Sequence, residues 1–242
     1  MKILGLDSSG LVAGVAVVED NVLLAEYTTN YKKTHSQTLL PMLEELRNMI
    51  ELDMDTIDAI AIASGPGSFT GLRIGSATAK GLGLALKKPL VEVPTLEGLA
   101  WNLWGVSRLV CPLMDARRNQ VYAAAYEFLP EVQGYRLESV ISQSPVDVVE
   151  LVKKLNEIGR EVIFLGDGVP VYHSLICQHI KVPFSFAPAS ANRQRAACIA
   201  ALGEVYFTAG KTVDAGEHKP EYLRKSQAER EQDTVDILIN DR

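Results

Sequence analysis

The sequence contains few of the residues that bind metals or form cross-links. Its 242 residues include only three cysteines and four histidines. Cys111, Cys177 and Cys198 show no C-x-x-C spacing, which predicts reduced thiols of a cytoplasmic protein rather than disulfides or a zinc site. No two histidines are four residues apart, the spacing that places two imidazoles on one face of a helix. We therefore expect no metal and no other cofactor.

Long apolar runs and an excess of basic residues are also missing. No apolar run reaches the roughly 20 residues of a membrane-spanning helix, and the first residues lack the basic segment and cleavage site of a secretion signal. The formal net charge is −6. An acidic chain has no general attraction for nucleic acid. We expect a cytoplasmic protein without membrane contacts, which would reach an RNA only through a partner.

A glycine-rich stretch stands between a strand-like run, residues 57–63, and an apolar helix that extends to Leu86. It reads Ser-Gly-Pro-Gly-Ser-Phe-Thr-Gly-Leu-Arg-Ile-Gly over residues 64–75. A phosphate-binding loop would need Lys after Gly71, and a dinucleotide fingerprint would need its third glycine one residue earlier. A tight strand-to-helix turn is the remaining interpretation.

Small residues recur at every fourth position of this helix, at Gly71, Gly75, Ala79 and Gly83. On a helix they form one stripe that is nearly free of side chains. Each glycine inside a helix costs up to about 1 kcal/mol relative to alanine. We therefore expect another backbone to lie very close to this stripe.

The predicted elements form two copies of the order βββαβαβ. The first copy has strands at 2–7, 11–18, 22–27, 57–63 and 89–93, and helices at 36–50 and 71–86. The second has strands at 109–114, 120–128, 135–142, 162–165 and 182–186, and helices at 146–156 and 169–179. This predicts an α/β fold of two lobes, 1–106 and 107–242, on the plan of the actin/sugar-kinase/Hsp70-like (ASKHA) superfamily.

The rest of the chain follows the second copy. A further helix over residues 192–210, with Asn192 as its cap, could cross back to the first lobe. Residues 225–233 are charged and predict a mobile tail.

Polar residues that follow the strands mark a candidate cleft between the lobes. In an active ATPase of this plan, one carboxylate after the first strand of each lobe faces the metal and nucleotide; here these are Asp7, followed by Ser8, and Asp115. Each could instead cap its own turn. Gly166-Asp167-Gly168 stands where a Gly-Gly turn would contact adenosine, and the Asp167 carboxylate would repel phosphates. We predict a vestigial cleft.

The glycine-rich stretch resembles the signature of the bacterial TsaB (YeaZ) family, dimerisation subunits of the tRNA threonylcarbamoyladenosine machinery. The resemblance continues at His35-Ser36-Gln37, at Asp115-Ala116-Arg117 and at Pro220-Glu221-Tyr222-Leu223-Arg224, and it spans nearly the full chain. It implies a scaffold that binds the catalytic paralogue TsaD, joined by the ATPase TsaE, and that forms a homodimer when alone. tRNA would be bound only through the complex.

The same resemblance implies that this chain lacks catalytic residues. The catalytic paralogues carry a His-x-x-x-His pair after the strand that follows the glycine-rich helix, where this chain has Thr95 and Leu99. Leucine cannot bind a metal, so this difference indicates a pseudo-enzyme. The alternative is an ATP-dependent phosphotransferase or a metallopeptidase-like enzyme of the same fold, as the old name glycoprotease for such sequences suggests.

The helices at 36–50 and 71–86 are apolar over more of their circumference than one lobe can cover. We expect them to pair with their equivalents in a second molecule, either a second copy or TsaD, unless the second lobe covers them. Arg in place of Gly75, or Glu in place of Leu43, would then block the contact. The predicted interface comprises Ser36, Leu39, Leu40, Leu43, Leu46 and Ile50 on the first helix, and Gly71, Ile74, Gly75, Thr78, Ala79 and Leu82 on the second.

Overall fold

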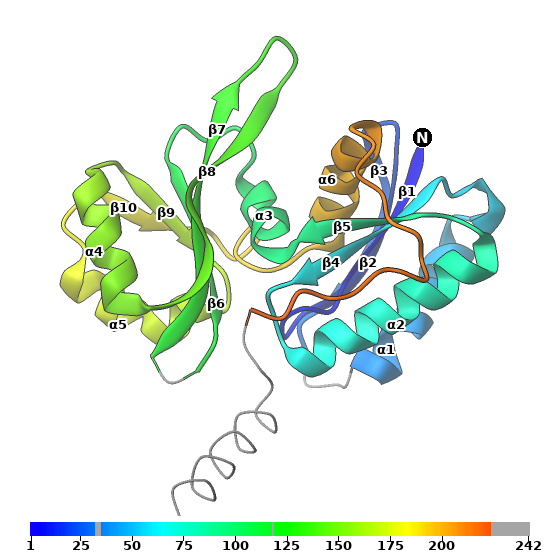
Figure 1. Ribbon diagram of the computed structural model, residues 1–242, viewed down its shortest axis with the longest axis horizontal. Coiled ribbons are helices and arrows are strands. Elements are labelled where there is room, and N and C mark those ends of the chain that lie inside the picture. The colour runs from blue at the N-terminus through cyan, green and yellow to red at the C-terminus, as the bar shows by residue number, and fades with distance from the viewer. Residues whose placement is uncertain (32–34, 118, 224–242) are drawn as a thin grey trace, which may run out of the picture.

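Two five-stranded sheets lie side by side, one in each lobe (Figure 1). The structure is a computed structural model, and it describes residues 1–31, 35–117 and 119–223. The first lobe contains β1 (Lys2–Asp7), β2 (Ala13–Glu19), β3 (Val22–Thr29), α1 (His35–Met49), a 3₁₀ turn (Met54–Thr56), β4 (Ala59–Gly65), α2 (Phe69–Leu86) and β5 (Leu90–Pro94).

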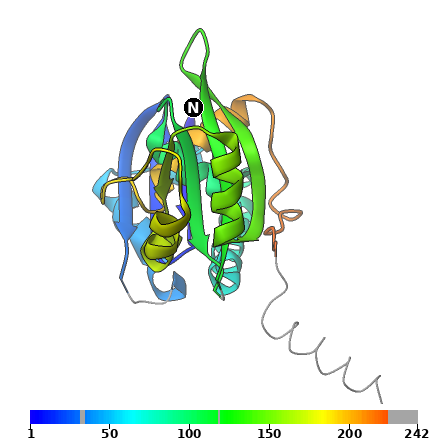
Figure 2. The same cartoon turned by 90° about the vertical axis from the view of Figure 1, so that its left-hand side faces the viewer.

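The second lobe repeats this order. It contains β6 (Leu109–Asp115), β7 (Gln120–Pro130), β8 (Tyr135–Asp147), α4 (Val148–Ile158), β9 (Val162–Leu165), α5 (Gly168–His179) and β10 (Phe184–Phe186). Figure 2, in which this lobe faces the viewer, shows the β7–β8 hairpin extending beyond the body of the molecule.

The sheet topology confirms the predicted duplication. The strand order is β3-β2-β1-β4-β5 in the first sheet and β8-β7-β6-β9-β10 in the second. In both sheets the first three strands pair antiparallel, and the fourth and fifth strands join parallel. The protein therefore has the two-lobed α/β architecture of the ASKHA plan.

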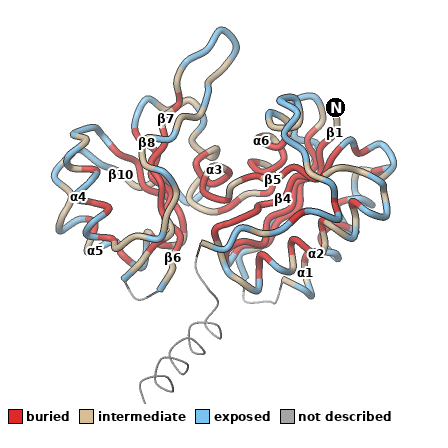
Figure 3. Tube along the Cα trace, in the orientation of Figure 1, coloured by how far each residue is buried: buried red, intermediate tan, exposed pale blue. Residues whose placement is uncertain are grey.

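Helices cover both faces of each sheet, and two of them cross between the lobes. α1 and α2 pack on one face of the first sheet, and α4 and α5 pack on one face of the second. The other face of the first sheet is covered by α6 (Ala196–Thr208), which follows the second lobe in the chain. The short helix α3 (Thr95–Ala100) packs on the second sheet. Figure 3 shows the buried residues gathered in the strands between these layers.

The predicted start of α6 was wrong. The helix begins at Ala196, after Arg195 with an extended backbone, and Asn192 makes no cap. The carbonyl oxygen of Asn192 instead accepts a hydrogen bond of 3.1 Å from the N–H of Gly166, which holds residues 192–195 against the second lobe. α3 was not predicted, because a helix of six residues is too short to show the apolar repeat of a helix in the sequence. The predicted mobile tail, 225–233, lies outside the described residues.

Glu26 of β3 takes the place of a local cap for α6. Its Oε1 accepts a hydrogen bond of 3.1 Å from the N–H of Ala197, and its Oε2 pairs with the guanidinium of Arg195. The carboxylate thus accepts one free backbone N–H at the start of α6, where the helix dipole favours negative charge.

Replacing Glu26 with alanine should lower the free energy of unfolding by about 2 kcal/mol, the usual effect of removing a charged hydrogen-bond acceptor from a largely buried site. Urea unfolding measures this change. Glu157→Ala, at an exposed position of α4, is the control and should change stability little. Equal stability of the two variants would show that α6 does not depend on Glu26.

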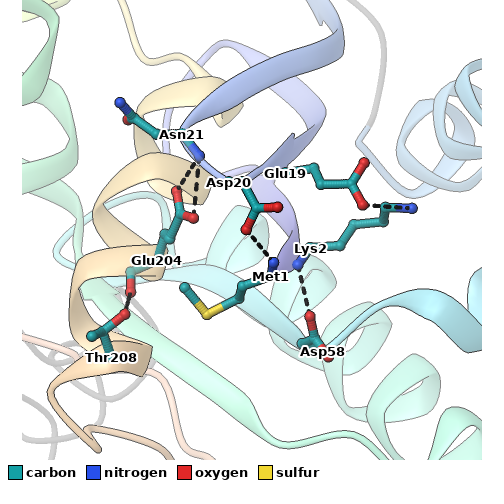
Figure 4. A network of polar contacts seen from close by, with 8 residues as sticks. All are labelled: Met1, Lys2, Glu19, Asp20, Asn21, Asp58, Glu204 and Thr208. Atoms are coloured by element: carbon teal, nitrogen blue, oxygen red, sulfur yellow. Dashed lines mark hydrogen bonds and ion pairs between the residues drawn. The ribbon is translucent and has the colours of Figure 1, made fainter.

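The other end of α6 is attached to the β2–β3 turn (Figure 4). The carboxylate of Glu204 accepts the N–H of Asn21 at 3.1 and 3.2 Å. Asp20 and Asn21 have φ values of 47° and 63°, as a two-residue hairpin turn requires. Asp20 also pairs with the amino group of Met1. α6 is therefore held to the first lobe at both ends.

Candidate functional site

The glycine-rich loop packs tightly against the turn that follows β1. The N–H of Ser68 donates a 2.7 Å hydrogen bond to the carbonyl oxygen of Ser9. A Cβ atom at Gly67 would lie 2.3 Å from the same oxygen, closer than real Cβ contacts come. Ser68 caps α2 by accepting the N–H of Gly71 at 3.3 Å. The loop is therefore closed by the chain's own backbone.

The glycine stripe of α2 faces the same turn, which confirms the predicted close approach of a backbone. A Cβ atom at Gly71 would lie 2.1 Å from the carbonyl oxygen of Ser8, and one at Gly75 would lie 2.5 Å from the Ser8 hydroxyl. That hydroxyl donates a 2.9 Å hydrogen bond to the carbonyl oxygen of Gly71. At the far end, a Cβ at Gly83 would lie 2.7 Å from Cβ of Ala215. The stripe thus serves packing within the chain.

Asp7 is buried and caps its own turn. Its Oδ1 accepts hydrogen bonds from the N–H of Ser9 at 2.8 Å and from the Ser9 hydroxyl at 2.7 Å. Burial raises the pKa of Asp7 to about 6, against the opposing effects of the Ser9 hydrogen bonds and of His35. Nε2 of His35 donates to the carbonyl oxygen of Gly10 at 2.8 Å. The turn-capping alternative therefore describes this carboxylate.

The second group of predicted cleft residues also forms a closed cluster. Asp115 accepts hydrogen bonds from the Tyr172 hydroxyl at 2.9 Å and from the N–H of Arg117 at 2.8 Å. Asp167 accepts the N–H of Asp115 at 3.1 Å, and burial raises the pKa of Asp167. Gly166 has φ of +109°, and a Cβ there would lie 2.0 Å from the carbonyl oxygen of Leu113. The Gly166–Gly168 turn is thus fixed against the end of β6.

The two groups belong to different lobes. Asp7 and Ser8 follow β1, whereas Asp115, Gly166, Asp167 and Gly168 gather at the ends of β6 and β9. No hydrogen bond between described residues joins the groups. Within the described part of the chain, no three His, Cys, Asp or Glu residues are grouped closely enough to hold a metal ion.

Thr95 and Leu99 are both fully buried. The Thr95 hydroxyl accepts a 3.2 Å hydrogen bond from the N–H of Gly65, and this ties α3 to the glycine-rich loop. Leu99 belongs to the apolar core between α3 and the second sheet. At the two positions where the resemblance implies a metal-binding pair in the paralogues, this chain thus has a structural hydroxyl and a core residue.

Half of the predicted interface residues are buried within their own lobe. Leu39, Leu43 and Leu46 of α1 belong to the core of the first lobe, and Gly71, Gly75 and Ala79 face the same core. Ser36 and Leu40 are exposed, and Ile50, Ile74, Thr78 and Leu82 are half-buried. Gly75 and Leu43 are themselves packed inside the lobe, so Gly75→Arg and Leu43→Glu would disrupt the lobe and cannot test a partner contact selectively.

A different stripe of α2 faces outward. Arg73, Ala77, Gly81 and Leu84 are exposed on the side opposite the glycine stripe. Leu84 is 60% exposed, and a Cβ atom at Gly81 would meet nothing within 4 Å. On α1, Leu40 is 53% exposed. The outer face of the two helices therefore exposes large apolar side chains among charged ones.

Both helices expose charged side chains. Glu44, Glu45 and Arg47 are exposed on α1, whereas α2 carries no acidic residue and presents Arg73. This outer face, which we call the α1–α2 face, comprises Leu40, Glu44, Glu45, Arg73, Ile74, Ala77, Thr78, Gly81, Leu82 and Leu84.

Comparison with known proteins agrees with the resemblance of the glycine-rich stretch to the TsaB (YeaZ) signature. Residues 22–232 match the family model described as TsaD, tRNA N6-adenosine threonylcarbamoyltransferase. The tRNA threonylcarbamoyladenosine biosynthesis protein TsaB of Bacillus subtilis is 32% identical over 95% of this chain and 96% of its own length. The chain belongs to the TsaB (YeaZ) family.

Further TsaB relatives agree with this assignment. TsaB of Escherichia coli is 28% identical over 94% of this chain and 96% of its own length. YeaZ from Pseudomonas aeruginosa superposes with a TM-score of 0.73 and 25% identity, over 92% of this chain and 99% of that structure. Among the described residues, no helix has both the length and the apolar character needed to cross a bilayer.

The sequence interpretation missed which side of α2 is free. Apart from Arg73, both stripes of the helix are made of small and apolar residues, so the pattern did not distinguish the packed stripe from the open one. It also did not place the Pro220–Arg224 motif. The structure brings Glu221 to the glycine-rich loop, where its N–H donates a 2.7 Å hydrogen bond to the carbonyl oxygen of Ser64. The spacing of residues along the sequence cannot predict such a contact between distant segments.

Proposed function

We propose that this protein is a non-catalytic subunit in tRNA threonylcarbamoyladenosine biosynthesis that binds its catalytic paralogue TsaD through the α1–α2 face. The observation that carries the proposal is the exposure of Leu40 and Leu84 on the outer face of α1 and α2, the second of which follows the family's signature loop. Large apolar side chains exposed together on one face are typical of a protein contact. The ATPase TsaE would join the pair, and the reaction would take place on TsaD.

Three features of the chain support a role without catalysis. Thr95 and Leu99 are buried in structural roles. The N–H groups of Gly65, Ser68 and Gly71 in the glycine-rich loop are all used within the chain, so they are not free to bind phosphate. The Asp7 carboxylate is bound by Ser9. An ATPase or metallopeptidase would direct side chains, N–H groups or carboxylates at these positions toward its substrate. In this chain they are bonded or packed within the fold instead.

Charged residues on the α1–α2 face could add to a paired-helix contact. In a homodimer of the isolated chain, Glu44 or Glu45 of α1 would pair with Arg73 of the other copy's α2, and attraction of this kind fixes register and speeds association. TsaD would take the place of the second copy on the same face, so the homodimer and the heterodimer exclude one another. With a net charge of −6, the chain would bind tRNA only as part of the complex, in the cytoplasm.

Purified protein tests the proposal directly. Alone, it should show no ATP turnover, no peptidase activity and no bound metal. Mixed with TsaD from the same organism, it should elute as a heterodimer on a sizing column and raise the rate at which TsaD modifies tRNA.

Two results would overturn the proposal. Robust ATP or peptide hydrolysis by the isolated chain, abolished by Asp115→Ala, would establish the alternative of a phosphotransferase or peptidase. Failure to form any complex with TsaD would remove the scaffold role.

A further inference from the structure

After α6 the chain returns across the first lobe beside β5 and α2 (Figure 1). We call residues 213–223 the C-terminal strap. Val213 and Leu90 of β5 exchange two backbone hydrogen bonds, of 2.9 and 3.0 Å. Nζ of Lys80 on α2 donates to the carbonyl oxygens of Gly216 and His218, at 2.9 and 3.2 Å. The strap is thus fixed along its length to the first lobe.

The ring of His218 adds a buried contact to this attachment. Its Nδ1 donates to Oε1 of Glu92 on β5 at 2.5 Å, and His218 is only 2% exposed. Near the end of the strap, the ring of Tyr222 stacks on Phe69 at the start of α2, with centroids 4.7 Å apart. Because these contacts come from β5 and α2, the path of the strap is set by the first lobe alone.

Glu221 extends from this fixed strap to the second lobe. Its N–H binds the carbonyl oxygen of Ser64, and a Cβ atom at Gly65 would lie 2.3 Å from the Glu221 carbonyl oxygen. Its carboxylate Oε2 accepts a 2.9 Å hydrogen bond from Nε2 of Gln143 on β8. The backbone of Glu221 therefore belongs to the first lobe and its side chain binds the second.

We propose that the C-terminal strap is a clamp that holds the two lobes in one relative orientation, with Glu221 and Gln143 as its closing contact. Residues 95–108 and 187–195 connect the lobes covalently, and two such connections allow rotation about a hinge. Next to these connections, α3 and α6 also contact each other through Glu97 and Tyr206. The Glu221–Gln143 bond adds a further attachment that is remote from both connections in sequence. Oε1 of Gln143 is buried without a partner, so the Glu221 carboxylate is the group that orients this amide.

Interlobe distances measured by pulsed electron spin resonance test the clamp on the full chain. One spin label is placed on the native Cys177, which is exposed on α5 while Cys111 and Cys198 are buried. The other is placed on Asp55→Cys, an exposed position before β4. Labelled protein is mixed with an excess of unlabelled protein, so that distances within one chain are recorded even in a homodimer.

Glu221→Ala and Gln143→Ala should each increase the population of displaced lobe orientations by up to roughly fivefold, the effect of losing one exposed hydrogen bond to a charged group. The double variant should add nothing, because the two residues make one contact. Glu217→Ala, a strap glutamate whose side chain is exposed, is the matched control and should keep the wild-type distribution.

Wild-type distances in Glu221→Ala, or additive effects in the double variant, would overturn the clamp. The far-ultraviolet circular dichroism spectrum checks that each variant is folded. All of these measurements use the protein without TsaD, so the clamp can fail while the proposed function stands, and the reverse also holds.

Discussion

Gly71→Ala is expected to lower the free energy of unfolding by about 3 kcal/mol, at the upper end of the effect of overpacking a core. The new Cβ would lie 2.1 Å from the carbonyl oxygen of Ser8. That oxygen belongs to the backbone of a buried turn, so it can move only if the turn moves. The hydrogen bond from the Ser8 hydroxyl to the Gly71 carbonyl oxygen would then be strained as well.

Gly81→Ala provides the matched control on the same helix. A Cβ atom at Gly81 meets nothing within 4 Å, so only helix propensity acts, and stability should rise by up to about 1 kcal/mol. Urea unfolding of both variants gives the comparison. If Gly71→Ala is as stable as Gly81→Ala, the stripe does not pack against the Ser8–Ser9 turn as described.

Asp7→Asn is expected to stabilise the protein in neutral solution by up to about 3 kcal/mol, which is the pKa difference expressed as free energy. Burial raises the pKa of Asp7 from 3.8 to about 6. The folded state therefore binds the proton more tightly than the unfolded chain, and stability falls as the pH rises from about 4 to about 6. Above that window the full cost of the buried charge remains. Asparagine keeps the oxygen that Ser9 binds and removes the charge.

Unfolding curves at a series of pH values test this sign. The difference between wild type and Asp7→Asn should be small near pH 4 and reach its maximum above about pH 6, where Asp7 is ionised in both states. Asp55→Asn, at an exposed carboxylate, should follow the wild-type profile. A constant difference at every pH would contradict the raised pKa of Asp7.

The order of the elements was predictable because each lobe repeats the same changes of periodicity. Alternating and continuous apolar runs marked the strands, and the glycine-rich loop marked the change to α2. The stripe at Gly71 and Gly75 also correctly predicted a close backbone. Glycine lowers the stability of a helix, so two glycines in one stripe indicate that a neighbouring segment lies too close for a side chain. Ser8 is that neighbour.

Contacts between distant segments were not predictable from spacing. Nothing in the sequence around Glu26 shows that it caps α6 across the sheet, and this contact sets where that helix starts. The open side of α2 depends on what the β1–β2 turn and Ala215 already cover. Glu221 could be noted as part of a motif, but its position against Ser64 and Gln143 follows only from the path of the strap.

The affinity of Gly81→Arg for TsaD, compared with that of Gly81→Ala, tests the central claim most directly. Both side chains start from open space on the α1–α2 face, so both variants should fold. Isothermal titration should show binding by the alanine variant close to wild type, and at least about 100-fold weaker binding by the arginine variant, the loss typical of an interface hot spot. Equal affinity of the two variants for TsaD would contradict the assignment of the α1–α2 face as the partner surface.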